Sequence, residues 1–369
     1  MARRPRHSII IPFHSSERLL RLCLKSILNS VPADVEKILV INNHREEEIP
    51  RKINSRLLRV VRYQQSLGYS RAINAGASVA RGQTLVFCDA DTFYSGNWFS
   101  NLVGFHKRTK NIGLASSRLL DPRTARVSDF GIGFTRYNAP HPYRDVRPDH
   151  PFVSKPRLVQ AASSANMIID AKLFTKIGAF DEDLHNAYSD LDLCLRLNEA
   201  GLQCWVVNES TVFHRGASAA THRGSYWADV KALFASKNAT RLHHDMQQYF
   251  DQSLRHHRDS KGFASKYLLI DLSSVVDRDW HHDLLREYVG LVSVYDYSPG
   301  LRDLATISLI DHLGLNALES RTALLYFVDR FMSLEQNRMW FDMRVRKDDL
   351  VVDRNANVAL LAEVVSAHH

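Results

Sequence analysis

Short apolar runs alternate with amphipathic segments through the first 90 residues. Four runs are too short to be helices and predict buried strands, at residues 8–13, 37–41, 59–63 and 85–88. Between them, residues 17–28 and about 70–80 repeat apolar positions at the spacing of one helix face. This alternation predicts an α/β fold, with a mostly parallel sheet and helices on both of its faces.

The regular alternation loosens after residue 91. Six prolines lie between residues 121 and 158, and they predict a long irregular loop with short strands, a type of loop that often serves function. Apolar residues return over 158–169 as a strand, and a short helix follows over 172–177. Ser189 is then expected to cap a helix, with Asp192 at the reciprocal capping position, and this helix is expected to end near Gly201. Residues 202–214 predict another strand.

The chain beyond residue 216 first appears helical and then becomes strongly polar up to residue 262. We therefore expect a first domain over residues 1–255 and a smaller α+β domain over residues 263–369. In the latter the pattern predicts strands at 267–272 and 290–295 separated by a helix, two helices within 300–337, a hairpin that pairs 340–345 with 350–352, and a last helix over 355–367. Docking or oligomerisation is the expected role. Nucleic-acid binding is disfavoured, because the second helix lacks a basic face.

Composition narrows the setting in which the protein works. The 369 residues are 45% hydrophobic, and no apolar run reaches the 18 or so residues that a membrane-spanning helix needs. The apolar segment at 9–13 is too short for a signal peptide, and four widely spaced cysteines predict neither a disulfide framework nor a zinc site. We expect a cytoplasmic protein. The net charge of +8 favours a polyanionic partner, such as an anionic membrane surface, an anionic glycan or nucleic acid.

Two acids separated by one residue directly follow the strand at 85–88. Because side chains alternate along an extended chain, Asp89 and Asp91 project to the same side. They lie at the carboxyl end of a strand, where open α/β sheets bind ligands. Two carboxylates this close repel each other unless a cation lies between them, and hard divalent ions suit such ligands. The alternative is a pair of acids that only cap the loop.

Several segments in order along residues 8–216 resemble glycosyltransferase family 2, the inverting enzymes with the GT-A fold. They are Ile9-Ile-Ile-Pro12, Gly68 to Gly76 with Asn74, Asp89-Ala-Asp91, Gly178-Ala-Phe-Asp181, Tyr188-Ser-Asp-Leu-Asp-Leu-Cys-Leu-Arg196 and Val212-Phe-His214. The resemblance is strongest to the rhamnosyltransferase-like branch that builds cell-surface polysaccharides. It implies a nucleoside-diphosphate sugar as donor, with UDP or dTDP as the nucleotide, and a glycan or lipid-linked acceptor. Contact with an anionic membrane surface is compatible with this role.

The resemblance also implies roles for individual residues. Asp91 would bind Mn²⁺ or Mg²⁺, Asp89 would contact the ribose or the water shell of the metal, and His214 would complete the metal ligands. Asp190 would be the general base that takes the proton of the acceptor hydroxyl. The alternatives are a solvent-facing histidine at a strand end for His214 and a helix cap for Asp190.

The remaining residues of the implied site bind the donor or orient the acceptor. The donor contacts would come from the two acids above together with Pro12, His14, Asn42, Gly68, Arg71 and Asn74, and the acceptor side from Ser189 and Asp192. The family usually has Asp where this chain has Asn42, so a nucleobase other than uracil or thymine becomes plausible. It usually has Glu where this chain has Ser189. Arg71 approaches the diphosphate or forms a surface salt bridge.

The sequence therefore predicts a metal-dependent inverting glycosyltransferase of surface polysaccharide synthesis. The enzyme alternative is a nucleotidyltransferase that makes sugar nucleotides, but His14-Ser-Ser-Glu17 lacks the glycine-rich basic loop typical of that class. The other alternative is an inactive scaffold that binds glycan or nucleic acid. The departures from the family pattern at Asn42 and Ser189 favour the scaffold. The presence of Asp89, Asp91, Asp190 and His214 favours an active enzyme.

Overall fold

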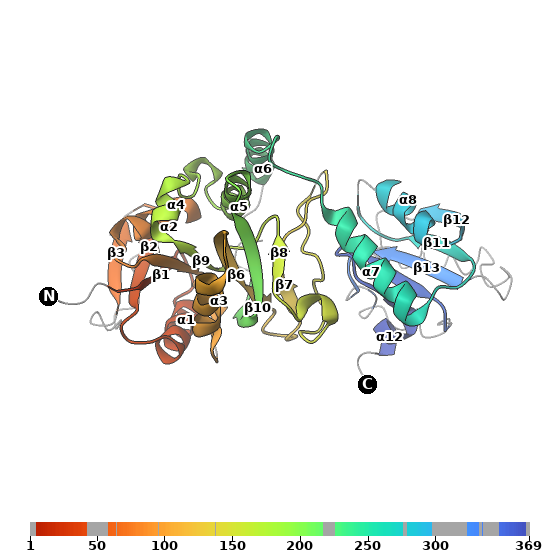
Figure 1. The fold of residues 1–369 in the computed structure, drawn as a ribbon, viewed down its shortest axis with the longest axis horizontal. Coiled ribbons are helices and arrows are strands. Elements are labelled where there is room, and N and C mark those ends of the chain that lie inside the picture. The colour runs from red at the N-terminus through yellow and green to blue at the C-terminus, as the bar shows by residue number, and fades with distance from the viewer. Residues whose placement is uncertain are drawn as a thin grey trace. The chain divides into compact units, whose positions relative to one another are not determined.

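The chain forms two compact units in the computed structural model (Figure 1). The structure describes residues 5–42, 58–63, 65–94, 96–136, 138–216, 226–275, 279–296, 323–331, 334 and 347–366. Within these ranges, every helix is too short or too polar to cross a lipid bilayer.

The first unit is a mixed sheet with helices packed on both faces. Its strands are β1 (His7–Phe13), β2 (Glu36–Asn42), β3 (Arg59–Tyr63), β4 (Thr84–Cys88), β5 (Thr92–Phe93), β6 (Ile112–Leu120), β7 (Val127–Asp129), β8 (Arg157–Val159), β9 (Asn166–Asp170) and β10 (Gln203–His214). Its helices are α1 (Glu17–Ser30), α2 (Tyr69–Val79), α3 (Trp98–Arg108), α4 (Ala171–Lys176), α5 (Ser189–Glu199) and α6 (Tyr226–Lys237), with short 3₁₀ turns at Pro151–Val153 and Glu182–Leu184.

The order of the strands brings distant parts of the chain to one edge of the sheet. The order is β3-β2-β1-β4-β9-β6-β10-β5, with β7 beside β6 and β8 beside β10. The first four strands in this order are parallel neighbours, β9 runs against both β4 and β6, and β6 is parallel to β10. The carboxyl ends of β4 and β10 therefore point to the same edge. The predicted α/β fold with a mostly parallel sheet is confirmed.

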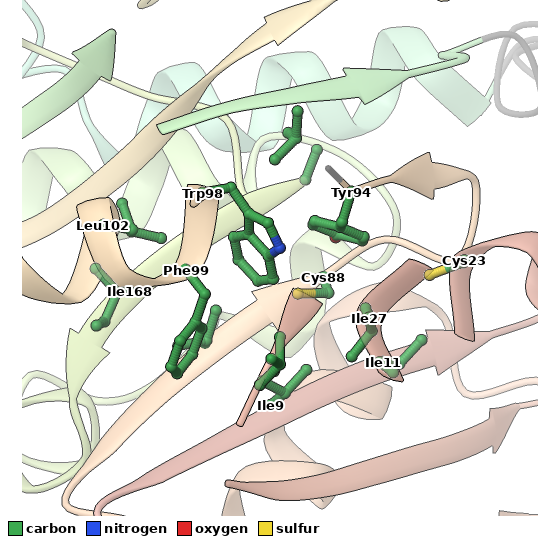
Figure 2. Packing of buried hydrophobic residues seen from close by; sticks show 14 of the residues in the cluster. Ile9, Ile11, Cys23, Ile27, Cys88, Tyr94, Trp98, Phe99, Leu102 and Ile168 are labelled. Carbon is green, nitrogen blue, oxygen red and sulfur yellow. The ribbon is translucent and has the colours of Figure 1, made fainter. Parts of the chain in front are cut away.

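Helices α1 and α3 cover one face of this sheet. Side chains from both helices form a buried cluster with alternate residues of β1 and β4, including Ile9, Ile11 and Cys88. Figure 2 shows this packing, with Trp98 and Tyr94 beside Cys88, the last residue of β4. The rings of Trp98 and Tyr94 are 4.4 Å apart between centroids. Because closely packed apolar side chains resist displacement, the end of β4 is a rigid base for the acids that follow it.

Helices α2 and α4 cover the opposite face. Helix α2 approaches the sheet so closely at Gly76 that a β-carbon there would lie 2.4 Å from a side-chain carbon of Ile10 and 3.0 Å from one of Val40. Phe87 of β4 packs edge-on against Phe174 of α4, with ring centroids 5.2 Å apart. Any larger residue at position 76 would therefore push α2 away from the sheet.

The second unit contains its own sheet and core. Its elements are α7 (Met246–Lys261), β11 (Tyr267–Asp271), α8 (Asp279–Tyr288), β12 (Leu291–Asp296), β13 (Ala323–Val328), β14 (Leu350–Asp353), β15 (Val358–Leu360) and α12 (Leu361–Ser366). The strand order is β12-β11-β13-β14-β15, and all neighbours are parallel except β14 and β15. A second, smaller domain with helices and strands is thus present as predicted, and its described strands are mostly parallel.

The two units divide at different residues from those expected. The first comprises Met1–Ile132 with Arg147–Leu242, and the second comprises Gly133–Val146 with His243–His369. Residues 133–146 belong to the second unit because they bond to it: the Tyr143 hydroxyl donates to Gln252 Oε1 at 2.9 Å, and the Tyr143 amide donates to the carbonyl of Asn355 at 2.8 Å. Helix α7 belongs there because Phe250 packs edge-on against Trp280 of α8.

Some predicted elements of the second unit are wrong or lie outside the described residues. Residues 323–328 form strand β13 and not part of a helix, because this apolar run is buried on both faces between β11 and β14. The last helix begins at Leu361 and not near residue 355, since 358–360 pair with β14 as β15. The predicted strand at 340–345 and the helices predicted before residue 323 lie outside the described residues.

Candidate active site

Three side chains that the sequence singled out converge at the carboxyl edge of the first sheet. Asp89 and Asp91 follow β4, and His214 ends β10, where it pairs with Thr92 of β5. His214 Nε2 lies 3.3 Å from Asp91 Oδ1 and 3.8 Å from Asp89 Oδ2. One potential ligand atom of each residue lies within 4.8 Å of the others. The short antiparallel pairing of β5 with β10 therefore brings together residues that are more than 120 positions apart in the sequence.

The electrostatics of this cluster fit a bound cation. The pKa of Asp89 is raised to about 6, mainly by burial; His214 lowers it, and the neighbouring Asp91 carboxylate adds to the rise. Burial alone would lower the pKa of His214, but the carboxylates of Asp91 and Asp89 outweigh it and raise that pKa. Asp89 Oδ1 is buried and has no hydrogen-bond partner among the described residues. Two carboxylates and an imidazole suit Mn²⁺ and also accept Mg²⁺, so the residues present fit either ion.

Asp190 occupies the first turn of α5 and is held by several donors. Its Oδ2 accepts hydrogen bonds from the amide and the hydroxyl of Ser164 at 3.0 and 3.2 Å, and its Oδ1 accepts one from the amide of Leu191 at 3.0 Å. Burial raises the pKa of Asp190, and these hydrogen bonds only partly offset that effect. The negative charge of Asp190 also contributes to the raised pKa of Asp89. A carboxylate of this kind is oriented and is a stronger base than an exposed one.

Two residues near these carboxylates were missed in the sequence. Ser164 lies in the short segment before β9, and the hydroxyl of Tyr69, the first residue of α2, donates to the Ser164 carbonyl at 3.4 Å. The only sequence signal for Tyr69 is its place directly after Gly68. Ser164 has no comparable signal, because serine next to a strand is common in loops.

The side chains of Asn42 and Asn74, which the sequence assigned to the donor, bind protein backbone. Asn42 ends β2, and its side chain donates to the carbonyl of Gly68 at 3.0 Å and accepts from the amide of Leu67. Asn74 of α2 exchanges hydrogen bonds with the backbone of Phe180, at 2.9 and 3.1 Å. Each of these amides thus shapes a loop beside the site.

The other donor residues from the sequence lie around the same edge. Gly68 has a φ of +78°, a left-handed conformation, and a β-carbon there would lie 3.3 Å from Asn186 Oδ1. Pro12 lies near the end of β1, and His14 follows that strand in an exposed position. Arg71 forms a surface salt bridge with Glu182, 3.2 Å between Nε and Oε2, with both side chains about half exposed. Of the two roles considered for Arg71, the salt bridge is the one present.

The side chains of Ser189 and Asp192 form contacts within the protein, and the expected capping of α5 by these residues is wrong. The residue before α5 is Tyr188, with a φ of +63° and no side-chain cap. Ser189 Oγ lies 2.5 Å from Ser70 Oγ, and both hydroxyls are buried. Asp192 is buried and accepts from Arg196 at 2.8 Å and from Asn238 at 2.9 Å. Ser189 and Asp192 thus bond Ser70, Asn238 and, one turn along the same helix, Arg196, and they do not cap the helix.

The sequence is similar to other proteins over part of its length. The chain is 28% identical over 246 residues to the O-antigen biosynthesis protein RfbC of Myxococcus xanthus, a match that covers 62% of this chain and 19% of RfbC. It is 26% identical over 233 residues to the inactive polypeptide N-acetylgalactosaminyltransferase-like protein 5 of Macaca fascicularis, covering 58% of this chain and 52% of the relative. The chain therefore spans about half or less of the length of these relatives.

A similar solved structure is that of GalNAc-T7 with UDP, GalNAc and Mn²⁺. It has a TM-score of 0.49 and 16% sequence identity, and the match covers 77% of this chain and 55% of GalNAc-T7. The family model described as glycosyl transferase family 2 matches residues 8–148, a range that contains strands β1 to β7 and both acids after β4. Residues 8–148 are therefore similar to glycosyl transferase family 2.

Proposed function

We propose that the first unit transfers a sugar from a nucleoside-diphosphate sugar to a hydroxyl group of a glycan or a lipid-linked acceptor, with inversion at the sugar carbon. The observation that carries this proposal is the convergence of Asp89, Asp91 and His214, together with a separately held carboxylate, Asp190. The two acids after β4 lie within the range that matches the family 2 model. Synthesis of a surface polysaccharide is the proposed setting, supported by the similarity to an O-antigen biosynthesis protein.

The two groups of carboxylates suit the two chemical needs of this reaction. Asp91, Asp89 and His214 would hold Mn²⁺ or Mg²⁺, which when bound neutralises charge on the leaving diphosphate. Asp190 would accept the proton of the attacking hydroxyl, because its Ser164 and Leu191 hydrogen bonds fix its orientation while burial strengthens it as a base. Asn42 and Asn74 would shape the donor-binding loops through their backbone hydrogen bonds, without reading the nucleobase themselves.

A ligand screen on the full chain tests this function. UDP, dTDP, GDP, CDP and ADP are each added with and without Mn²⁺, and the melting temperature is recorded, because a ligand that prefers the folded state stabilises it. We expect one nucleoside diphosphate to raise the melting temperature only when Mn²⁺ is present, and the corresponding nucleotide sugar to be hydrolysed slowly. Release of pyrophosphate from a nucleoside triphosphate and a sugar phosphate would instead identify a nucleotidyltransferase. The absence of any shift would favour an inactive scaffold.

A further inference from the structure

Two adjacent residues before β9 contact both parts of the candidate active site. The carbonyl of Ala165 accepts a hydrogen bond from the amide of Asp89 at 2.9 Å. The amide and hydroxyl of Ser164 both donate to Asp190 Oδ2. This segment therefore links the backbone of Asp89 to the side chain of Asp190.

The beginning of α2 is bound to the chain just before Asp190. The amide and the hydroxyl of Ser70 each donate to the carbonyl of His185 at 2.8 Å, and the Ser70 hydroxyl also contacts that of Ser189. The amide of Tyr69 donates to Asn186 Oδ1 at 2.7 Å. These bonds fix the first turn of α2 to the segment that leads into α5.

The side chain of Tyr69 joins these two sets of contacts. Its hydroxyl donates to the carbonyl of Ser164, so residues 69–70, 164–165 and 189–190 form a closed ring of hydrogen-bonded segments. The ring of Tyr69 also packs near Phe180, with centroids 6.1 Å apart.

We propose that Tyr69 is a positioning residue that sets the spacing between the Asp89 and Asp190 carboxylates by closing this ring. The inference rests on the proposed function for its catalytic consequence, because a displacement reaction needs the leaving group and the incoming hydroxyl in line. Errors of about 1 Å in such an arrangement cost roughly 100-fold in rate. Tyr69 does not itself exchange a proton with the substrate.

The test is Tyr69→Phe, which removes one oxygen atom and keeps the ring against Phe180. We expect kcat for hydrolysis or transfer of the accepted nucleotide sugar to fall about 10- to 100-fold. The KM for the donor should stay within about threefold, because donor contacts are retained. The matched control is Tyr143→Phe, which removes a buried hydroxyl that bonds Gln252 in the second unit and should leave kcat unchanged.

A crystallographic comparison of the wild type with Tyr69→Phe separates this inference from the proposed function. Displacement of Asp89 relative to Asp190 in the variant supports positioning by Tyr69, even if the wild type binds no nucleotide and the proposed function fails. Unmoved carboxylates overturn the inference. So does an unchanged kcat in an active enzyme, or a loss of kcat that merely follows a large fall in melting temperature.

Discussion

At the scale of single residues, Asp190 combines burial with three hydrogen bonds, and these have opposite effects on its proton affinity. Burial raises its pKa, whereas the donors from Ser164 and Leu191 favour the ionised form. The result is a carboxylate that is held in one orientation and still has an appreciable affinity for a proton. Both properties are needed in a general base, because a base must be deprotonated before the reaction and must accept a proton during it.

Replacing this carboxylate tests its role directly. Asp190→Asn keeps an oxygen that accepts from Ser164 but cannot take a proton, so we expect at least a roughly 100-fold loss of kcat with donor binding intact. Calorimetry for the donor and a steady-state assay for transfer give the two quantities. The control is Glu199→Gln, an acid at the exposed end of the same helix that pairs with Arg241. Turnover that survives in Asp190→Asn would remove Asp190 as the base.

Asp91 is the acid closest to His214, and its removal should weaken binding of the metal. We expect Asp91→Ala to lower the affinity for Mn²⁺ by more than about 10-fold, because one ligand is lost and His214 loses its nearest charge partner. Electron paramagnetic resonance of free Mn²⁺ measures this in the absence of any nucleotide. Asp149→Ala, at an exposed acid paired with Arg147, is the matched control. Equal Mn²⁺ affinity in both variants would exclude Asp91 as a ligand.

The sequence was sufficient to predict residues whose role follows from local geometry. Asp89 and Asp91 share a side of the chain because of the strand period, and their place after a buried strand put them at the binding edge of the sheet. The contacts of Ser189 and Asn42 could not be predicted in this way. Ser189 bonds Ser70, which lies 119 positions away, and Asn42 bonds a loop 25 positions away, and no local pattern encodes such partners.

At the scale of elements, α5 is the helix that carries Asp190, and a buried ion pair fixes it in place. Arg196 pairs with Asp192 one turn earlier and also donates to the carbonyls of Ile177 and Ala179. The Asp192 side chain is only 4% exposed, so water has little access to this ion pair. The same contacts hold the loop after α4 against the helix.

Breaking this pair should destabilise the first unit. Arg196→Met leaves a buried carboxylate and two carbonyls without their donor, so we expect a loss of about 2–4 kcal/mol in the free energy of unfolding. Arg147→Met removes an exposed pair with Asp149 and should cost no more than about 0.5 kcal/mol. Urea unfolding of both variants provides the comparison. Similar values for the two would mean that Asp192 is satisfied by Asn238 alone.

The sequence predicted element boundaries correctly where the apolar periodicity agreed with the positions of helix-ending residues. The prediction was wrong where an apolar run fitted both a helix and a strand. The strands β1, β2 and β4 and the helix α1 lie within one or two residues of their predicted positions. The run at 323–328 was assigned to a helix because short continuous apolar stretches do not distinguish a buried helix from a buried parallel strand. This run forms a strand because it pairs with β11 and β14, and both of these strands are remote in sequence.

At the scale of the whole molecule, the chain leaves the first unit, contributes residues 133–146 to the second, and returns. The proline-rich stretch predicted as a loop is therefore divided between the two units. Its middle part is fixed by specific contacts, including the bidentate pair between Asp145 and Arg330. Composition predicts that such a segment is irregular, but it does not indicate to which of the two units the segment belongs. The expected role of the second unit in docking or oligomerisation stays a prediction.

The second unit contains a buried acid that links its stability to pH. Asp353 ends β14, is fully buried, and accepts hydrogen bonds from the amides of Asn355 and Asn357 and from the side chain of Asn357. Burial raises its pKa to about 7, despite these donors. An unfolded aspartate titrates near pH 4, so the folded state binds the extra proton between about pH 4 and pH 7. The contribution of Asp353 to stability is therefore present at low pH and is lost as the pH rises through about 7.

Comparison with Asp353→Asn isolates this effect, because the amide resembles the protonated carboxyl at every pH. The opposing contribution of His257, whose pKa burial lowers to about 4, is present in both proteins and cancels in the difference. We expect the variant to gain stability relative to the wild type between about pH 4 and pH 7, by at most about 4 kcal/mol, and the difference to stay constant above that range. Urea unfolding of the full chain, with hydrogen exchange of β14 to identify the transition of the second unit, measures it. A difference in stability that does not change with pH would mean that Asp353 is ionised in the folded protein throughout this range. The control is Asp348→Asn, at an exposed turn, which should reproduce the wild-type dependence of stability on pH.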